Sequence, residues 1–204
     1  MYGLHFTLRD THAAFYRKCW DDPEGDTLFV HCDFKQADTV PVGPVETGTW
    51  WYAGSRLAIT VLTFITWGAG LPRQYVTYCS HILEQSAACV VSCMEDLLTR
   101  VVDVKGYKKM LLFADVGNHF RAACTVAYWT GGLLDKFPFL QSTEIVFFPE
   151  HHGKGPVDGH FGKMAAWKHT TAKSRVISSL REYVTIMQER ADEAHEYGKP
   201  RPGA

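Results

Sequence analysis

The chain has 204 residues, of which 46% are hydrophobic and 21% charged, and its formal net charge is −1. This composition is typical of a globular protein with a substantial core, and it excludes a uniformly basic nucleic-acid-binding protein. The most apolar stretch, residues 57–71, is too short and too interrupted by glycine to span a bilayer, so we expect no membrane partner. Six cysteines without a CxxC pair, and no secretory signal, predict reduced thiols in an intracellular protein, nuclear if the host is eukaryotic.

The first elements in chain order predict an N-terminal helical lead-in followed by three strands. The lead-in covers residues 1–26, with a short helix over 9–20. Short runs rich in β-branched and aromatic residues predict strands, and clustered proline and glycine predict a loop. The strands cover residues 27–34, 49–53 and 58–66, the loop covers 36–48, and Gly54-Ser55 is compatible with a hairpin turn. The short links predict an antiparallel meander.

The hydrophobic period then changes to three or four residues, which is typical of amphipathic helices. We expect an alternation of helices and strands, followed by a disordered tail over residues 198–204. The helices cover 73–102 with its lead-in, 119–133, 160–170 and 172–197, and the strands cover 109–115 and 144–148. Because β-α-β units make neighbouring strands parallel, we predict an α/β fold. Its five-stranded mixed sheet has three antiparallel strands, then two parallel ones, with helices on both faces.

Three aspartates occupy positions suited to chemistry. Asp33 and Asp115 lie where the first and fourth strands end, and Asp158 lies in a glycine-rich loop before a helix. A carboxylate beside apolar residues is partly desolvated unless a cation neutralises it, and converging carboxylates suit Mg²⁺ or Mn²⁺. The alternatives are a strand-end residue bonded to backbone for Asp33, and turn or helix-cap roles for Asp115 and Asp158. Glu150 is a competing third acid.

The order of elements, with acids at these three places, resembles the RNase H-like fold over roughly residues 27–170. In particular it resembles the catalytic core of DDE/DDD transposases and retroviral integrases. Asp33 matches the first-strand acid of that family, and Asp115, in Phe113-Ala114-Asp115-Val116-Gly117-Asn118-His119-Phe120, matches the fourth-strand acid. The run from His152 to Phe161 resembles the stretch around the third acid, with Asp158 where integrases carry Glu.

The resemblance implies a divalent-metal-dependent polynucleotidyl transferase over residues 27–197. Asp33, Asp115 and Asp158 would hold two Mg²⁺ or Mn²⁺ ions, which activate water or a DNA 3′-hydroxyl and stabilise the leaving oxygen. Two other functions stay open: an RNase H-like nuclease, and a catalytically inactive transposase-derived subunit that binds nucleic acid within a larger assembly.

Residues 151–181 carry six lysines and arginines and one acid, Asp158, which predicts a stripe that contacts phosphate. The expected partner is DNA, with RNA as an alternative, in a homo-oligomer or a larger assembly. A solvated helix face is the competing interpretation. The predicted nucleic-acid contacts are His152, Lys154, His160, Lys163, Lys168 and Lys173. For the histidines, including His119 and His151, packing is the simpler role, and a zinc site is hard to build because adjacent side chains of an extended segment diverge.

Overall fold

The structure is a computed structural model, and it describes residues 2–45, 56–101, 106–148 and 155–197. The chain divides into two compact units. The first unit consists of Met1–Phe34, Leu62–Tyr78 and Glu84–Val157, and the second of Lys35–Val61, Cys79–Leu83 and Asp158–Ala204. Each unit is described by itself below.

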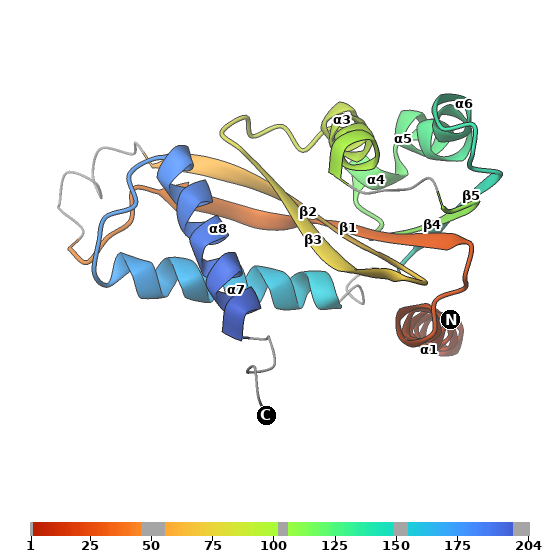
Figure 1. The fold of residues 1–204 in the computed structure, drawn as a ribbon, viewed down its shortest axis with the longest axis horizontal. Coiled ribbons are helices and arrows are strands. Elements are labelled where there is room, and N and C mark those ends of the chain that lie inside the picture. Colours follow the sequence, from red (N-terminus) through yellow and green to blue (C-terminus); the bar gives the residue numbers. More distant parts are fainter. Residues whose placement is uncertain (1, 46–55, 102–105, 149–154, 198–204) are drawn as a thin grey trace. The chain divides into compact units, whose positions relative to one another are not determined.

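A five-stranded mixed sheet has the order β3-β2-β1-β4-β5 (Figure 1). The strands are β1 (Thr27–Val40), β2 (Leu57–Gly68), β3 (Leu71–Ser80), β4 (Lys109–Ala114) and β5 (Ser142–Phe147). The first three are antiparallel, and β4 and β5 run parallel to β1. Strands β1, β2 and β3 each contribute residues to both units. The predicted α/β fold with this mixed sheet is confirmed.

The third antiparallel strand is not the segment that the sequence analysis chose. Residues 49–53 and the Gly54-Ser55 turn lie outside the described residues, and the third strand is β3, which we had assigned to the lead-in of a helix. The turn before it uses Gly70, whose φ of +76° is a conformation that favours glycine. The hydroxyls of Thr63 and Thr77 lie 2.9 Å apart across β2 and β3, so this strand pairs through side chains as well as backbone.

Helix α1 and a group of shorter helices lie on opposite faces of the sheet in the first unit (Figure 1). The helical segments are α1 (Tyr2–Asp21), α3 (Ala87–Asp96), α4 (Asn118–Arg121), α5 (Ala123–Ala127) and α6 (Leu133–Lys136), with π-helical turns η1 (Leu97–Val101) and η2 (Tyr128–Gly132). Helix α3 begins after Ser86, whose hydroxyl accepts a hydrogen bond from the Cys89 amide at 3.2 Å. The predicted helix over 119–133 is divided into several short helices. The predicted helix over 73–102 begins only at Ala87.

The residues of β1 alternate between two cores. Leu28, Val30 and Cys32 belong to the core on the side of α3, together with Met94 and Trp129. The intervening residues face α1, where Tyr16, Phe29, His31, Trp67, Phe113 and Phe148 form an aromatic cluster with ring centroids 4.8–6.1 Å apart. Each ring pair adds about 0.5–1.5 kcal/mol beyond its buried area, so α1 is firmly tied to the sheet.

The second unit contains α7 (Pro156–Ala172) and α8 (Leu180–Tyr197). The predicted helix over 172–197 begins later because Ile177 forms an antiparallel bridge with Val42, with backbone hydrogen bonds of 2.7 and 3.1 Å. Helix α8 then begins at a capping sequence, in which the Ser179 hydroxyl accepts from the Glu182 amide at 3.3 Å. In the described part of the chain, no helix is long and apolar enough to cross a lipid bilayer.

Candidate functional site

Asp33 lies within β1, and Asp115 directly follows β4, the parallel neighbour of β1 in the first unit. The sequence predicts Asp33 at the end of its strand, but β1 continues to Val40 because its second half also belongs to the sheet. The β1–β4 register pairs His31 with Phe113, which are 82 residues apart, and the same 82 residues separate Asp33 from Asp115. Aligned residues of adjacent strands lie about 4.8 Å apart in a sheet. Asp115 directly follows Ala114, the last residue of β4, so the pair lies toward the carboxyl end of that strand.

The thiol of Cys32 lies near both carboxylates. It is buried between the strands, with its Sγ atom 3.8 Å from the Phe113 carbonyl oxygen. Burial raises the pKa of this thiol well above its usual value, and the negative charges of Asp33 and Asp115 raise it further. The two carboxylates therefore disfavour a further negative charge near Cys32. A bound divalent cation would offset this repulsion.

Asp115 also shapes the turn after β4. Its Oδ1 atom accepts a hydrogen bond from the Gly117 amide at 2.8 Å, as in an Asx turn. The turn-forming role that we considered for Asp115 is thus real, and it fixes the orientation of the carboxylate. A carboxylate has two oxygens with several acceptor sites, so this bond leaves capacity to bind a cation.

His119 lies beside this turn. A Cβ atom on Gly117 would come within 2.8 Å of Asp115 Oδ1 and 2.9 Å of His119 Nε2, so both atoms border the same small space. The ring is packed edge-on against Phe34 and Phe120, at 4.6 and 4.2 Å between centroids. Burial lowers the pKa of His119, an effect that the Asp115 charge partly opposes. Its Nε2 atom is buried without a hydrogen-bond partner in the described part of the chain.

A neutral histidine lies two residues before Asp33 on the same strand. His31 is 2% exposed, and its Nδ1 atom lies 3.0 Å from the Tyr16 hydroxyl. Burial lowers the pKa of His31 to about 3, so the ring is uncharged at neutral pH. It therefore acts as packing beneath Asp33 and adds no charge to the pair.

Asp158 lies in the first turn of α7, in the second unit, and is exposed. Asp158 is therefore part of the helix and not of the preceding loop that the sequence predicts, and a carboxylate in a first turn interacts favourably with the helix dipole. The structure brings Asp33 and Asp115 together within one unit, and the convergence of Asp158 with them stays a prediction. Glu150, His151, His152 and Lys154 lie outside the described residues. Within either unit, the described residues contain no group of three potential metal ligands that could hold an ion.

The predicted phosphate-contacting lysines within and directly after α7 divide into two kinds. Lys168 donates to Asp38 Oδ1 at 2.5 Å, and its side chain is 19% exposed. The sequence analysis assigned this ammonium to nucleic acid, but in the structure it is engaged by a carboxylate inside the second unit. Lys163 and Lys173 are exposed, and their contact with nucleic acid stays a prediction.

His160 is half-buried, with its ring 6.5 Å from that of Trp167. Burial lowers the pKa of His160, and the nearby Lys163 charge lowers it further.

Asp38 is the centre of a buried polar cluster that the sequence analysis missed. It is 6% exposed and also accepts hydrogen bonds from Lys35 and the Tyr183 hydroxyl, each at 2.7 Å. Burial raises the pKa of Asp38, but the hydrogen bonds from Lys168, Lys35 and Tyr183 outweigh it, and the net pKa lies below the usual value. The spacing Lys35-x-x-Asp38 was visible, but it fell in a segment predicted as the start of a loop.

No protein-family model and no curated protein sequence matches the chain. Among solved structures, the chain is similar to a Mos1 transposase paired-end complex with the left transposon end, at 13% identity and a TM-score of 0.52. The match covers 95% of this chain and 54% of that one, so this chain spans about half the length of the transposase. A Mos1 strand transfer complex matches at 14% identity and a TM-score of 0.46, over 95% and 53% of the two chains. The first likeness shows the fold: it is the RNase H-like fold of a transposase.

Proposed function

We propose that this protein is a divalent-metal-dependent polynucleotidyl transferase of the transposase and integrase type, which cuts and joins DNA phosphodiesters. One observation carries the proposal: two residues beyond the last β1–β4 register pair, His31 and Phe113, the sequence has Asp33 in β1 and Asp115 directly after β4. Open α/β sheets bind ligands beyond the carboxyl ends of their strands, and Asp115 lies at such an end. The RNase H-like fold supports the same conclusion, because it positions acids at these places in the enzymes that the sequence resembles.

The donor chemistry of the pair fits a hard divalent cation. Both side chains supply carboxylate oxygens, the ligands that Mg²⁺ and Mn²⁺ prefer, and the charge of each raises the pKa of the Cys32 thiol, which supports their proximity. We propose that Asp33 and Asp115, completed by Asp158, hold two such ions. When bound, the ions would supply an activated hydroxyl and stabilise the leaving oxygen of an in-line displacement.

Uncharged groups around Asp33 and Asp115 would position the site. The Gly117 amide fixes one oxygen of Asp115, and the packed His119 ring presents its unpartnered Nε2 atom to the same space. In this arrangement the neutral His119 would hydrogen-bond to Asp115 or to a phosphate oxygen and hold it in place. The exposed Lys163 and Lys173 of the second unit would contact the DNA backbone.

A strand-transfer assay tests this proposal. The full chain is incubated with Mg²⁺ or Mn²⁺, a supercoiled plasmid and a labelled duplex with free 3′-hydroxyls. We expect label to be joined to the plasmid by the wild type and by Glu84→Gln, an exposed acid outside the site. Asp33→Asn and Asp115→Asn should lose the product. Nicking without joining would identify a nuclease, and neither reaction under any divalent ion would identify an inactive DNA-binding subunit.

A further inference from the structure

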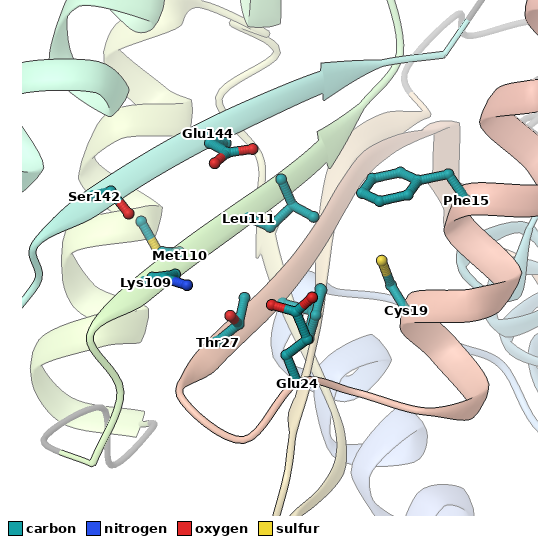
Figure 2. Close-up of a pocket in the computed structure, with 10 residues that line it drawn as sticks. Phe15, Cys19, Glu24, Thr27, Lys109, Met110, Leu111, Ser142 and Glu144 are labelled. Atoms are coloured by element: carbon teal, nitrogen blue, oxygen red, sulfur yellow. The ribbon is translucent and has the colours of Figure 1, made fainter.

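A second concave site lies in the first unit, on the α1 face of the sheet. A cavity of about 270 Å³ opens between α1 and the beginnings of β1, β4 and β5 (Figure 2). Thr27, Lys109 and Ser142, the first residues of the three strands, lie at its edge. Thr27 is six residues from Asp33, which is about 20 Å along an extended strand. The cavity is therefore separate from the proposed catalytic pair.

The floor of this cavity is apolar. Phe29 and Leu111 of the sheet are 2% and 6% exposed, and Phe15 and Cys19 project into the cavity from α1 (Figure 2). Phe15 is 40% exposed, although its ring lies 6.1 Å from that of buried Phe113. A half-covered aromatic ring beside a cavity leaves one face open to a ligand.

Two carboxylates without a cation border the same cavity. Glu24 and Glu144 lie on different sides of it (Figure 2), and among the described residues neither has an ion-pair partner. The one lysine of the lining, Lys109, has its Nζ atom 3.8 Å from Asp26 Oδ1, so a third acid already offsets its charge. Burial raises the pKa of the Cys19 thiol, which lines the cavity, and the nearby Glu24 charge raises it further. An apolar floor with an acidic rim selects a cation that has an apolar stem.

The neighbouring sheet edge indicates that this cation belongs to a polypeptide. Strand β5 ends the sheet order, and no described strand pairs with its outer side. Such an edge can accept an extended segment through backbone hydrogen bonds, and alternate side chains of that segment then face one side of the sheet. Glu144 lies on β5 and lines the cavity, so a side chain of an added strand would meet it.

We propose that this cavity is a docking site for an arginine of a partner polypeptide, whose extended backbone pairs with the outer edge of β5. Arginine fits better than lysine because its planar guanidinium can stack on an aromatic ring such as Phe15 while it donates to a carboxylate of the rim. The acidic rim repels phosphate, so this surface does not bind DNA. The site therefore links the protein to another protein while leaving the Asp33 and Asp115 end of the sheet accessible.

Peptide titrations followed by NMR test this inference without any enzymatic activity. The probe is acetyl-Thr-Val-Arg-Val-Thr-amide, and its control replaces arginine with citrulline, which has nearly the same shape and no charge. We expect the arginine peptide to shift the amide resonances of Cys19, Leu111 and β5, with an affinity at least about tenfold higher than that of the citrulline peptide. In the double variant Glu24→Gln and Glu144→Gln, the affinity of the arginine peptide should fall to that of the citrulline peptide. In Glu84→Gln, the affinity of the arginine peptide should be unchanged.

Three results would overturn the inference. The first is equal binding of both peptides, or no shifts at millimolar peptide. The second is unchanged arginine-peptide affinity in a folded double variant, confirmed by its amide spectrum. The third is that the amide resonances around the cavity shift with increasing protein concentration in the absence of peptide. The occupant would then be a second copy of this chain. Loss of strand transfer bears only on the proposed function, because the peptide titration does not depend on it.

Discussion

Lys168 and Asp38 form a buried ion pair of 2.5 Å that ties α7 to β1 within the second unit. With Lys35 and Tyr183 also bonded to Asp38, four side chains from three elements satisfy one another away from water. Burying these charges is unfavourable by itself, so the cluster stabilises the unit only while every partner is present.

Asp38→Asn should destabilise the protein strongly. The substitution leaves two partly buried ammonium groups without a counter-charge, and breaking such a cluster costs about 3–5 kcal/mol. Urea unfolding followed by fluorescence measures the loss. Asp22→Asn, which changes an exposed aspartate, is the matched control and should stay within about 0.5 kcal/mol of the wild type. Equal stability of the two variants would show that the cluster contributes nothing.

The same cluster predicts a dependence of stability on pH. The folded-state pKa of Asp38 lies below its usual value because its hydrogen bonds outweigh burial, so the unfolded chain binds the proton more readily. The stabilisation is therefore complete above the usual aspartate pKa and is lost as the pH falls through the lowered pKa of the folded protein. Unfolding free energies measured across the acid range should fall less steeply for Asp38→Asn than for the wild type.

Lys163 and Lys173 are expected to contact DNA phosphates, whereas Lys168 is not. Changing both exposed lysines to alanine should weaken duplex binding about equally for all sequences. The slope of log affinity against log salt should decrease by about 0.9 for each phosphate contact that is lost. Fluorescence anisotropy at several salt concentrations measures it. An unchanged slope would show that these lysines only solubilise the helix.

Gly117→Ala is expected to impair the site more than the fold. Its new methyl group would meet Asp115 Oδ1 and His119 Nε2 at under 3.0 Å, so one of these side chains must move. We expect strand transfer to fall at least about tenfold, because small misplacements of catalytic groups are costly. Stability should change by about 1 kcal/mol, because the Asp115 carboxylate can rotate away from the new methyl group while the packed His119 ring stays in place. Gly162→Ala in α7, where an added methyl meets nothing, is the control. Full activity of Gly117→Ala would show that the position of these two groups is unimportant.

The sequence sufficed for the mixed sheet and for an acid directly after β4, because hydrophobic period and turn residues are local signals. Asp33 lies within β1 and not at the predicted strand end. Sequence patterns did not predict the elements whose structure depends on contacts between residues that are distant in the sequence. Leu71–Ser80 is a strand because it pairs with β2, and Asp38, near the end of β1, is bonded by Lys168 and Tyr183, which are 130 and 145 positions away. The sequence separation between Asp33 and Asp115 equals that between His31 and Phe113. This equality has a structural meaning only because His31 and Phe113 are register partners on β1 and β4.

If Asp33 and Asp115 jointly hold a divalent ion, as we propose, electron paramagnetic resonance will detect the binding of Mn²⁺ to this pair. We predict that the wild type binds Mn²⁺ and that its melting temperature rises with Mn²⁺ concentration, since a ligand bound only to the folded state stabilises it. Asp33→Asn and Asp115→Asn should each reduce the affinity at least about tenfold and abolish the thermal shift, while Asp22→Asn should retain both. Wild-type affinity for Mn²⁺ in either folded site variant would contradict the account.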